Sequence, residues 1–289
     1  MTCPVKWFLG SKILKDEYQL SEAKFLNIEA SEDLGDKILC LEEGREYLQI
    51  QFRKETPGAH MEKLKAFWRM PDGPQLLNSW FEWLVDGSRD GSLVFSIQDH
   101  IDTVVKYTAR ILGKNRGEEW DVKLDEVRTN CQTMNGNDTM LKVFIIRQLA
   151  ISWKNSPEKL FFVEGEDEVC NSSKQPFIHI LKVAQNGEED YDEKVVISVR
   201  VGTTTVFDKV SLTEGLAAII QLCFVFNLLY PSDCDDVFNY VQRVLARFGP
   251  SEGARNMKGV VKKKFQSFQC DLADIIMLEK AGTVKKLLV

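Results

Sequence analysis

The hydrophobic pattern of the first half of the chain has the period of helices. Apolar residues recur at helical spacing over residues 97–112, which predicts a helix with one buried face. Residues 117–133 are rich in charge and predict an exposed helix, whereas residues 140–153 are apolar on nearly every side and predict a core helix. We therefore expect residues 1–156 to form a mostly helical region.

Two local features add detail to this helical region. Ser96 followed by Asp99 resembles a capping pair, so we expect the helix over residues 97–112 to begin there. Further upstream lies a dense group of aromatic residues, which forms either a core or a binding face, and we expect a core. Its members are Phe67, Trp68, Trp80, Phe81 and Trp83.

The pattern changes near Pro157 to short β-branched runs separated by turn residues. Residues 160–163 and 177–183 are predicted strands, and residues 194–207 predict a β-hairpin around a Gly-Thr turn. Strands grouped together and then followed by helices favour an α+β fold over alternating βαβ units. We therefore expect residues 157–289 to form a small antiparallel sheet with C-terminal helices.

A helix–proline–helix unit is expected to pack on this sheet. Ser211 and Glu214 form a capping box at the start of an apolar helix. The apolar run over residues 215–229 is interrupted by two amides and is shorter than the about twenty residues of a membrane span, so we interpret it as a core helix. Pro231 cannot continue that helix.

The second helix of the unit is expected to begin at Ser232. Three carboxylates, Asp233, Asp235 and Asp236, then fall in its first turn, where the exposed amides favour negative charge. The helix start explains this acidic group, so a metal site is not required.

Composition and charge narrow the range of possible functions. The 289 residues have a net charge of −6 with 44% hydrophobic and 28% charged residues, which argues against a protein that coats nucleic acid through its overall field. Seven cysteines are scattered without a close pair, so we expect no disulfides. The start of the chain lacks the long apolar core of a signal peptide. We expect a soluble protein of the cytoplasm or nucleus.

The chain contains none of the common catalytic or cofactor-binding motifs, so we expect no cofactor and lean against an enzyme. Its three histidines are His60, His100 and His179, and no spacing pairs one of them with a nucleophile. Asp208 is the best-placed carboxylate for a metal-dependent nuclease. The alternative, that Asp208 is simply the polar end of a hairpin strand, is favoured.

One basic segment is a candidate for nucleic-acid binding. Lysines could hold phosphates and phenylalanines could stack on bases. The candidate residues are Lys258, Lys262, Lys263, Lys264, Phe265 and Phe268. The alternative is a solvated helix face whose two phenylalanines point to the core, and the acidic balance of the chain favours it.

A resemblance to a known family rests on the helix–proline–helix unit. Residues 226–231 read FNLLYP, residues 237–242 read VFNYVQ, and the unit ends in Phe248-Gly249. This pattern is similar to the C-terminal region of a multicopy group of vertebrate proteins, abundant in fish, some of which are named for a sterile alpha motif domain. The resemblance covers residues 160–250. It implies an origin in mobile elements and no particular activity or ligand.

These observations lead to one functional expectation and two alternatives. The first is a non-enzymatic intracellular protein that binds another macromolecule, a protein in the leading hypothesis. The second is a nucleic-acid-binding protein of mobile-element origin that uses Lys258 to Phe268. The third is a relative of metal-dependent nucleases. No membrane association is expected.

Overall fold

The structure is a computed structural model with an α+β fold, divided into two compact units. The first unit comprises Met1–Ser88 and Gln221–Leu228, and the second comprises Arg89–Ile220 and Leu229–Val289. The structure describes residues 77–79, 81–82, 93–114, 116–133, 138–167, 175–184, 193–202, 204–225, 230–247 and 259–287.

In the first unit, the described residues form part of a small core. Phe81 is buried and its ring meets that of Phe224 edge-on, with centroids 5.4 Å apart. Gln221 donates a hydrogen bond of 2.8 Å to Asn78. Phe81 is therefore a core residue, as expected for the aromatic group, whose other members lie outside the described residues.

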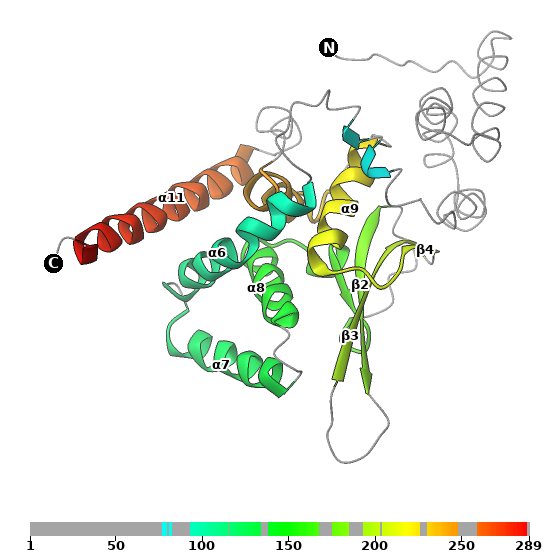
Figure 1. Ribbon diagram of the computed structural model, residues 1–289, viewed down its shortest axis with the longest axis horizontal. Coiled ribbons are helices and arrows are strands. Elements are labelled where there is room, and N and C mark those ends of the chain that lie inside the picture. Colours follow the sequence, from blue (N-terminus) through cyan, green and yellow to red (C-terminus); the bar gives the residue numbers. More distant parts are fainter. Residues whose placement is uncertain are drawn as a thin grey trace, which may run out of the picture. The chain divides into compact units, whose positions relative to one another are not determined.

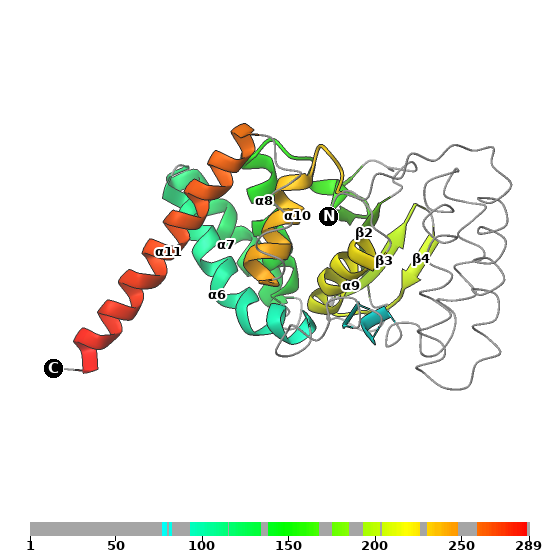
Figure 2. The ribbon, with the colours of Figure 1, turned by 90° about the horizontal axis from the view of Figure 1, so that it is seen from above.

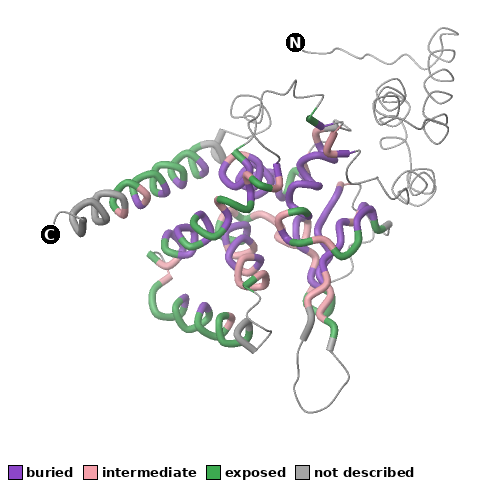
Figure 3. Tube along the Cα trace, in the orientation of Figure 1, coloured by how far each residue is buried: buried purple, intermediate pink, exposed green. Residues whose placement is uncertain are grey.

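Three helices form one side of the second unit (Figure 1). They are α6 (Leu93–Lys114), α7 (Glu118–Thr133) and α8 (Thr139–Ser152). The expected stripe on α6 is confirmed, since its apolar positions from Ile97 to Leu112 and the intervening Thr108 are buried. α7 is mostly exposed, as Figure 3 shows. α8 is less uniformly buried than its composition suggested, because Ile151 is 48% exposed.

The expected start of α6 is wrong. The helix begins at Leu93, so Ser96 lies inside its first turns instead of capping them. The Ser96 hydroxyl donates a hydrogen bond of 2.9 Å to the carbonyl of Ala246, 150 residues later in the chain. A serine followed by an acid has the sequence of a cap, but here a distant carbonyl binds the hydroxyl instead.

The sheet has the order β1-β2-β3-β4. Its strands are β1 (Phe161–Val163), β2 (Pro176–Ala184), β3 (Glu193–Val201) and β4 (Thr204–Phe207). The hairpin between β3 and β4 is confirmed, with Gly202 at φ 59° in its turn. The prediction of an all-antiparallel sheet is wrong, because β1 pairs with β2 in parallel. Hydrophobic alternation reports which face a residue occupies and carries no information on strand direction.

Helix α9 (Leu212–Val225) covers one face of this sheet (Figures 1 and 2). Its predicted capping box is confirmed: the Glu214 N–H donates to the Ser211 hydroxyl at 3.2 Å, and the Ser211 N–H donates to the Glu214 carboxylate at 2.7 Å. Gly215 faces the sheet, where a Cβ would meet Ile178 on β2 at 3.4 Å, an ordinary van der Waals contact. This packing buries the apolar face formed by Ile178 and Ile180.

The second helix after Pro231 is shorter than expected. α10 (Asp235–Tyr240) continues into a π-helical segment, η3 (Val241–Leu245). Ser232 is not its cap, because residues 231–234 form a turn closed by a 2.9 Å bond from the Cys234 N–H to the Pro231 carbonyl. Asp233 therefore precedes the helix and is exposed, whereas Asp235 and Asp236 occupy the first turn.

Helix α11 (Gly259–Leu287) lies beside α6 and α10, as Figures 1 and 2 show. An aromatic cluster joins it to the other helices. The ring of Trp153, at the end of α8, lies 6.1 Å from that of Phe265, 5.5 Å from that of Phe268 and 6.2 Å from that of Tyr240. Among the described helices, none is long and apolar enough to cross a membrane.

Candidate functional site

A groove of about 650 Å³ runs between α6, α7 and α8. Its floor is apolar and its rim is charged. Val105, Ala109, Gly113, Trp120, Leu124, Leu141 and Ile145 form the floor. Asp102, Lys106, Arg110, Lys114, Asp121, Arg128, Asp138 and Lys142 form the rim.

Gly113 and Trp120 determine how closely α7 approaches α6. A Cβ at Gly113 would lie only 3.0 Å from Cδ1 of Trp120, so the absent side chain leaves room for the indole. The other neighbours of the indole are Phe144 on α8, stacked at 5.8 Å between ring centroids, and the Arg116 guanidinium at 5.2 Å from the ring. Trp120 is thereby held as a fixed wall of the groove.

The rim carries five basic and three acidic side chains, so its formal charge is +2 in a chain whose net charge is −6. Lys142 is the most enclosed of the basic residues. It bonds Asp102 at 2.6 Å and Asp138 at 3.0 Å. Burial opposes its charge, but these two carboxylates outweigh burial and raise the pKa of Lys142. Lys142 therefore stays protonated at neutral pH.

Two further rim cations already bind a carboxylate. Glu279 on α11 contacts Arg110 and lies 3.6 Å from Lys106. Tyr107, between them on α6, donates a 2.5 Å hydrogen bond to the same carboxylate. Hydrogen bonds from Tyr107 and Arg110 lower the pKa of Glu279, which keeps it ionised. This edge of the groove can therefore hold a carboxylate that a helix presents.

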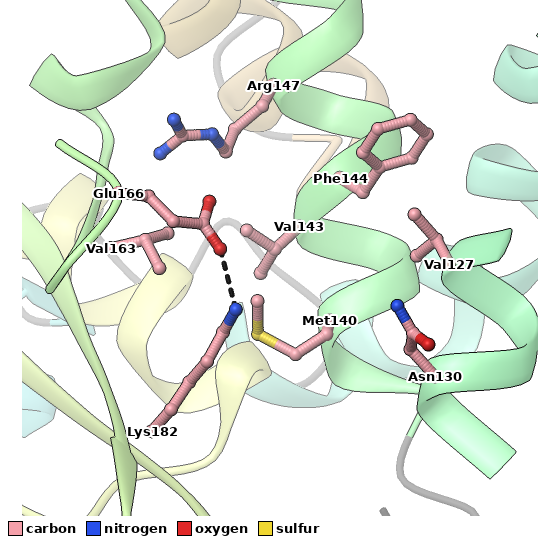
Figure 4. Close-up of a pocket in the computed structure, with 9 residues that line it drawn as sticks. All are labelled: Val127, Asn130, Met140, Val143, Phe144, Arg147, Val163, Glu166 and Lys182. Atoms are coloured by element: carbon pink, nitrogen blue, oxygen red, sulfur yellow. Dashed lines mark hydrogen bonds and ion pairs between the residues drawn. The ribbon is translucent and has the colours of Figure 1, made fainter. Parts of the chain in front are cut away.

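A second, smaller cavity of about 180 Å³ lies between α7, α8 and the β1–β2 edge of the sheet (Figure 4). Its apolar lining comes from Val127, Met140, Val143, Phe144 and Val163. Its polar lining comes from Asn130, Arg147, Glu166 and Lys182.

Two ion pairs stand on one side of this cavity. Lys182 bonds Glu166 at 2.6 Å, and Arg147 bonds both oxygens of Asp167 at 2.7 Å. Burial opposes the charge of Asp167, but the hydrogen bonds from Arg147 and from the Val163 N–H outweigh burial and lower the pKa of Asp167. The Arg147–Asp167 pair is therefore ionised at neutral pH.

His179 belongs to a polar row across the sheet, in which His179 and Ser198 are buried and Glu164 is exposed. Its Nε2 donates to Glu164 at 2.9 Å, its Nδ1 lies 3.5 Å from the Ser198 hydroxyl, and its ring stacks on Phe162. Burial and the charge of Arg200 lower the pKa of His179, although Glu164 acts in the opposite direction. The order Glu-His-Ser has the residue types of a catalytic triad. Ser198 is buried, however, and lines neither cavity described above, so we interpret the row as structural.

Of the three carboxylates near Pro231, only Asp235 and Asp236 lie together in the first turn of α10, and Asp233 precedes the helix. Asp235 and Asp236 are buried at the start of α10, where burial and the neighbouring Asp235 raise the pKa of Asp236. The side-chain amide of Asn155 donates a 3.3 Å hydrogen bond to the Asp236 carboxylate. This amide is neutral, so it adds no negative charge that could help to hold a metal ion. Among the described residues, no group of three histidine, cysteine or acidic side chains could hold a metal ion.

The candidate nucleic-acid residues are divided between the surface and the interior. Lys263 and Lys264 are exposed on α11, whereas Phe265 and Phe268 are buried against Trp153. Lys258 and the side chain of Lys262 lie outside the described residues.

The remaining candidates from the sequence are Asp208, two histidines and the cysteines. Asp208 is exposed after the end of β4. The Nδ1 of His100 donates a 2.6 Å bond to the Ser96 carbonyl inside α6, where His100 is half-buried. His60 lies outside the described residues. Three cysteines have described side chains, and all are free: Cys223 and Cys234 are buried, and Cys270 is exposed.

Neither cavity was predicted from the sequence. The signal that could have indicated the two cavities is a residue that departs from the pattern of its helix. Lys142 and Arg147 are basic residues in the apolar helix α8, and Trp120 is an aromatic residue in the charged helix α7. Comparison with protein-family models, with curated proteins and with solved structures found no match to this chain.

Proposed function

We propose that this protein is a non-enzymatic binding module whose α6–α7–α8 groove holds an acidic amphipathic helix of a partner protein. The observation that carries the proposal is the combination of an apolar floor with a rim of net positive charge. An apolar floor favours the apolar face of a helix, and a basic rim favours acidic residues flanking that face.

The dimensions of the groove support a helical occupant. Asp102 and Lys114 stand twelve positions apart on α6 and both belong to the rim. At a rise of 1.5 Å per residue this length is about 18 Å, which corresponds to roughly three turns of a partner helix. A helix of that length presents apolar residues at positions i, i+3, i+4 and i+7, enough to cover the floor.

The molecule itself supplies an example of the proposed recognition. Glu279 is carried on a helix, and Lys106, Tyr107 and Arg110 bind its carboxylate. A partner helix that lies along the rim would offer its carboxylates to the exposed Lys114 and Arg128 in the same manner. The buried free thiols Cys223 and Cys234 support a reducing compartment, so we propose that the binding takes place in the cytoplasm or nucleus.

Two designed peptides test the proposal. Each is a labelled fourteen-residue amphipathic helix with the same leucine face; one has glutamates on its flanks and the other has lysines. In fluorescence anisotropy, the acidic peptide should bind saturably and weaken as salt rises, since exposed charges are screened. Equal affinity for the basic peptide, or no binding of either, contradicts the proposal.

Nucleic acid is the competing outcome. A labelled DNA duplex that binds the wild-type protein, and no longer binds a Lys262→Glu, Lys263→Glu, Lys264→Glu variant, would replace the protein partner with nucleic acid. A duplex that does not bind at physiological salt leaves the helix as the occupant.

A further inference from the structure

The smaller cavity combines a buried apolar floor with a charged opening. Val143 and Val163 are 1% and 0% exposed at its floor. The side chains of Lys182 and Glu166 retain 31% and 49% exposure, so their ion pair stands where the cavity meets solvent. Figure 4 shows this pair on one side, Val127 and Phe144 on the other, and Val143 and Met140 between them.

The charges beside the opening are balanced. Two cations, Lys182 and Arg147, stand with two carboxylates, Glu166 and Asp167. Arg147 uses three of its five N–H donors here, one in a 2.7 Å bond to the Phe161 carbonyl and two in its bonds to Asp167. Lys182 and Glu166 share one hydrogen bond of 2.6 Å and remain open to further partners on their exposed sides.

We propose that this cavity binds a free α-amino acid with an apolar side chain. The α-carboxylate would approach Lys182 and the α-ammonium would approach Glu166, so that the four charges alternate in sign. The apolar side chain would enter the space between Met140, Val143 and Phe144. This site shares no lining residue with the groove, so it does not depend on the proposed function.

The volume of the cavity limits the size of the side chain that the bound amino acid can carry. A cavity of about 150 Å³ lined by apolar residues is large enough for benzene. The space here is about 180 Å³, which suits the branched chain of leucine or the thioether of methionine. Met140 can adjust to either shape, since its unbranched side chain adopts several rotamers.

The balanced charge explains why a zwitterion is favoured over a singly charged ligand. A ligand with only a carboxylate would repel Glu166, and a ligand with only an amine would repel Lys182, because those two groups are adjacent. A zwitterion meets each group with the opposite charge. Its net charge of zero also preserves the balance at the opening.

Three probes with the same branched alkyl group separate these contributions. They are L-leucine, 4-methylpentanoate, which lacks the ammonium, and 3-methylbutylamine, which lacks the carboxylate. Titration calorimetry on the full chain should show saturable binding of leucine with a Kd in the millimolar range or tighter. Each singly charged probe should bind at least about tenfold more weakly. Equal binding of all three probes, or no saturation by leucine, overturns the proposal.

Variants then locate the binding. Lys182→Met and Glu166→Gln each remove one charge at the opening and should weaken leucine binding at least about tenfold. The matched control is the exposed pair Lys123 and Glu119 on α7, 3.3 Å apart, changed to Lys123→Met and Glu119→Gln. Cooperative thermal unfolding checks that each variant is folded. Leucine binding that the cavity variants leave unchanged overturns the site.

Discussion

Thr108 on α6 and Tyr240 on α10 share a buried hydrogen bond of 2.9 Å across 132 residues of sequence. The Thr108 hydroxyl donates its one proton to the Val104 carbonyl at 2.8 Å, so the Tyr240 hydroxyl must be the donor to Thr108. Burial raises the pKa of Tyr240, which keeps that proton in place. This bond links the helix that forms the groove to the helix that follows Pro231.

Removal of the acceptor should be more harmful than removal of the donor. Thr108→Val leaves the Tyr240 O–H buried without a partner and should lower the free energy of unfolding by about 1–3 kcal/mol. Tyr240→Phe leaves Thr108 bonded to Val104 and should cost about 0.5–1.5 kcal/mol. The double variant should cost less than the sum of the two. Denaturant unfolding measures all three, and strict additivity would contradict the shared bond.

Arg147 should be among the residues most important for stability. The side chains of Arg147 and Asp167 are only 16% and 11% exposed, and their bidentate pair connects α8 to the turn after β1. Arg147→Ala leaves Asp167 enclosed without its cation and should destabilise the protein by about 3 kcal/mol. Arg128→Ala, which removes an exposed partner of Asp125, is the control and should change stability by less than about 1 kcal/mol. Similar losses in the two variants would contradict the assignment.

His179 should make the protein less stable in mild acid. Its pKa is lowered in the folded state, so as pH falls through the ordinary histidine value of about 6.5 the unfolded chain takes up a proton that the folded chain resists. Stability is then lost with falling pH, by at most about 1.4 kcal/mol per pH unit for one proton. Unfolding measured between pH 7 and pH 5 should show a steeper loss in the wild type than in His179→Gln. Parallel curves would exclude this origin.

Glu279 should hold the C-terminal part of α11 on α6. Glu279→Ala removes the contacts with Lys106, Tyr107 and Arg110, so amide hydrogen exchange over α11 should speed up near that residue. Asp274→Ala changes an exposed acid on the same helix and serves as the control. Exchange should stay slow around Phe265 and Phe268, whose rings pack on Trp153. Equal acceleration in the two variants would show that the carboxylate does not hold the helix.

Local chemistry made part of this fold predictable. The apolar stripe over residues 97–112 and the capping box of Ser211 and Glu214 each lie within one element, so the sequence carries their whole signal. The prediction failed where a distant group decides the outcome. Ser96 binds the Ala246 carbonyl, and the three-residue β1 pairs with β2 in parallel, a direction that its own residues do not encode.

The groove could not be predicted for a related reason. Its floor and rim come from three helices. Within each helix, the contributing residues look like ordinary core or surface residues of that helix. Lys106 and Arg110 are exposed cations on α6, and Trp120 is one aromatic residue in a charged helix. Their joint property, a basic rim around an apolar floor, exists only after Trp120 packs beside Gly113.

The most direct test of the groove is a charge exchange. Lys114 and Arg128 are exposed rim residues, and a Lys114→Glu, Arg128→Glu variant reverses the charge of both. Lys123→Glu, on α7 but outside the groove, is the control. Affinity for the glutamate-flanked and the lysine-flanked helical peptides is measured for all three proteins.

The wild type and the control should prefer the glutamate-flanked peptide. The double variant should bind that peptide about tenfold more weakly and should bind the lysine-flanked peptide more tightly than the wild type does. If the double variant retains wild-type affinity for both peptides, the α6–α7–α8 groove is not the binding site.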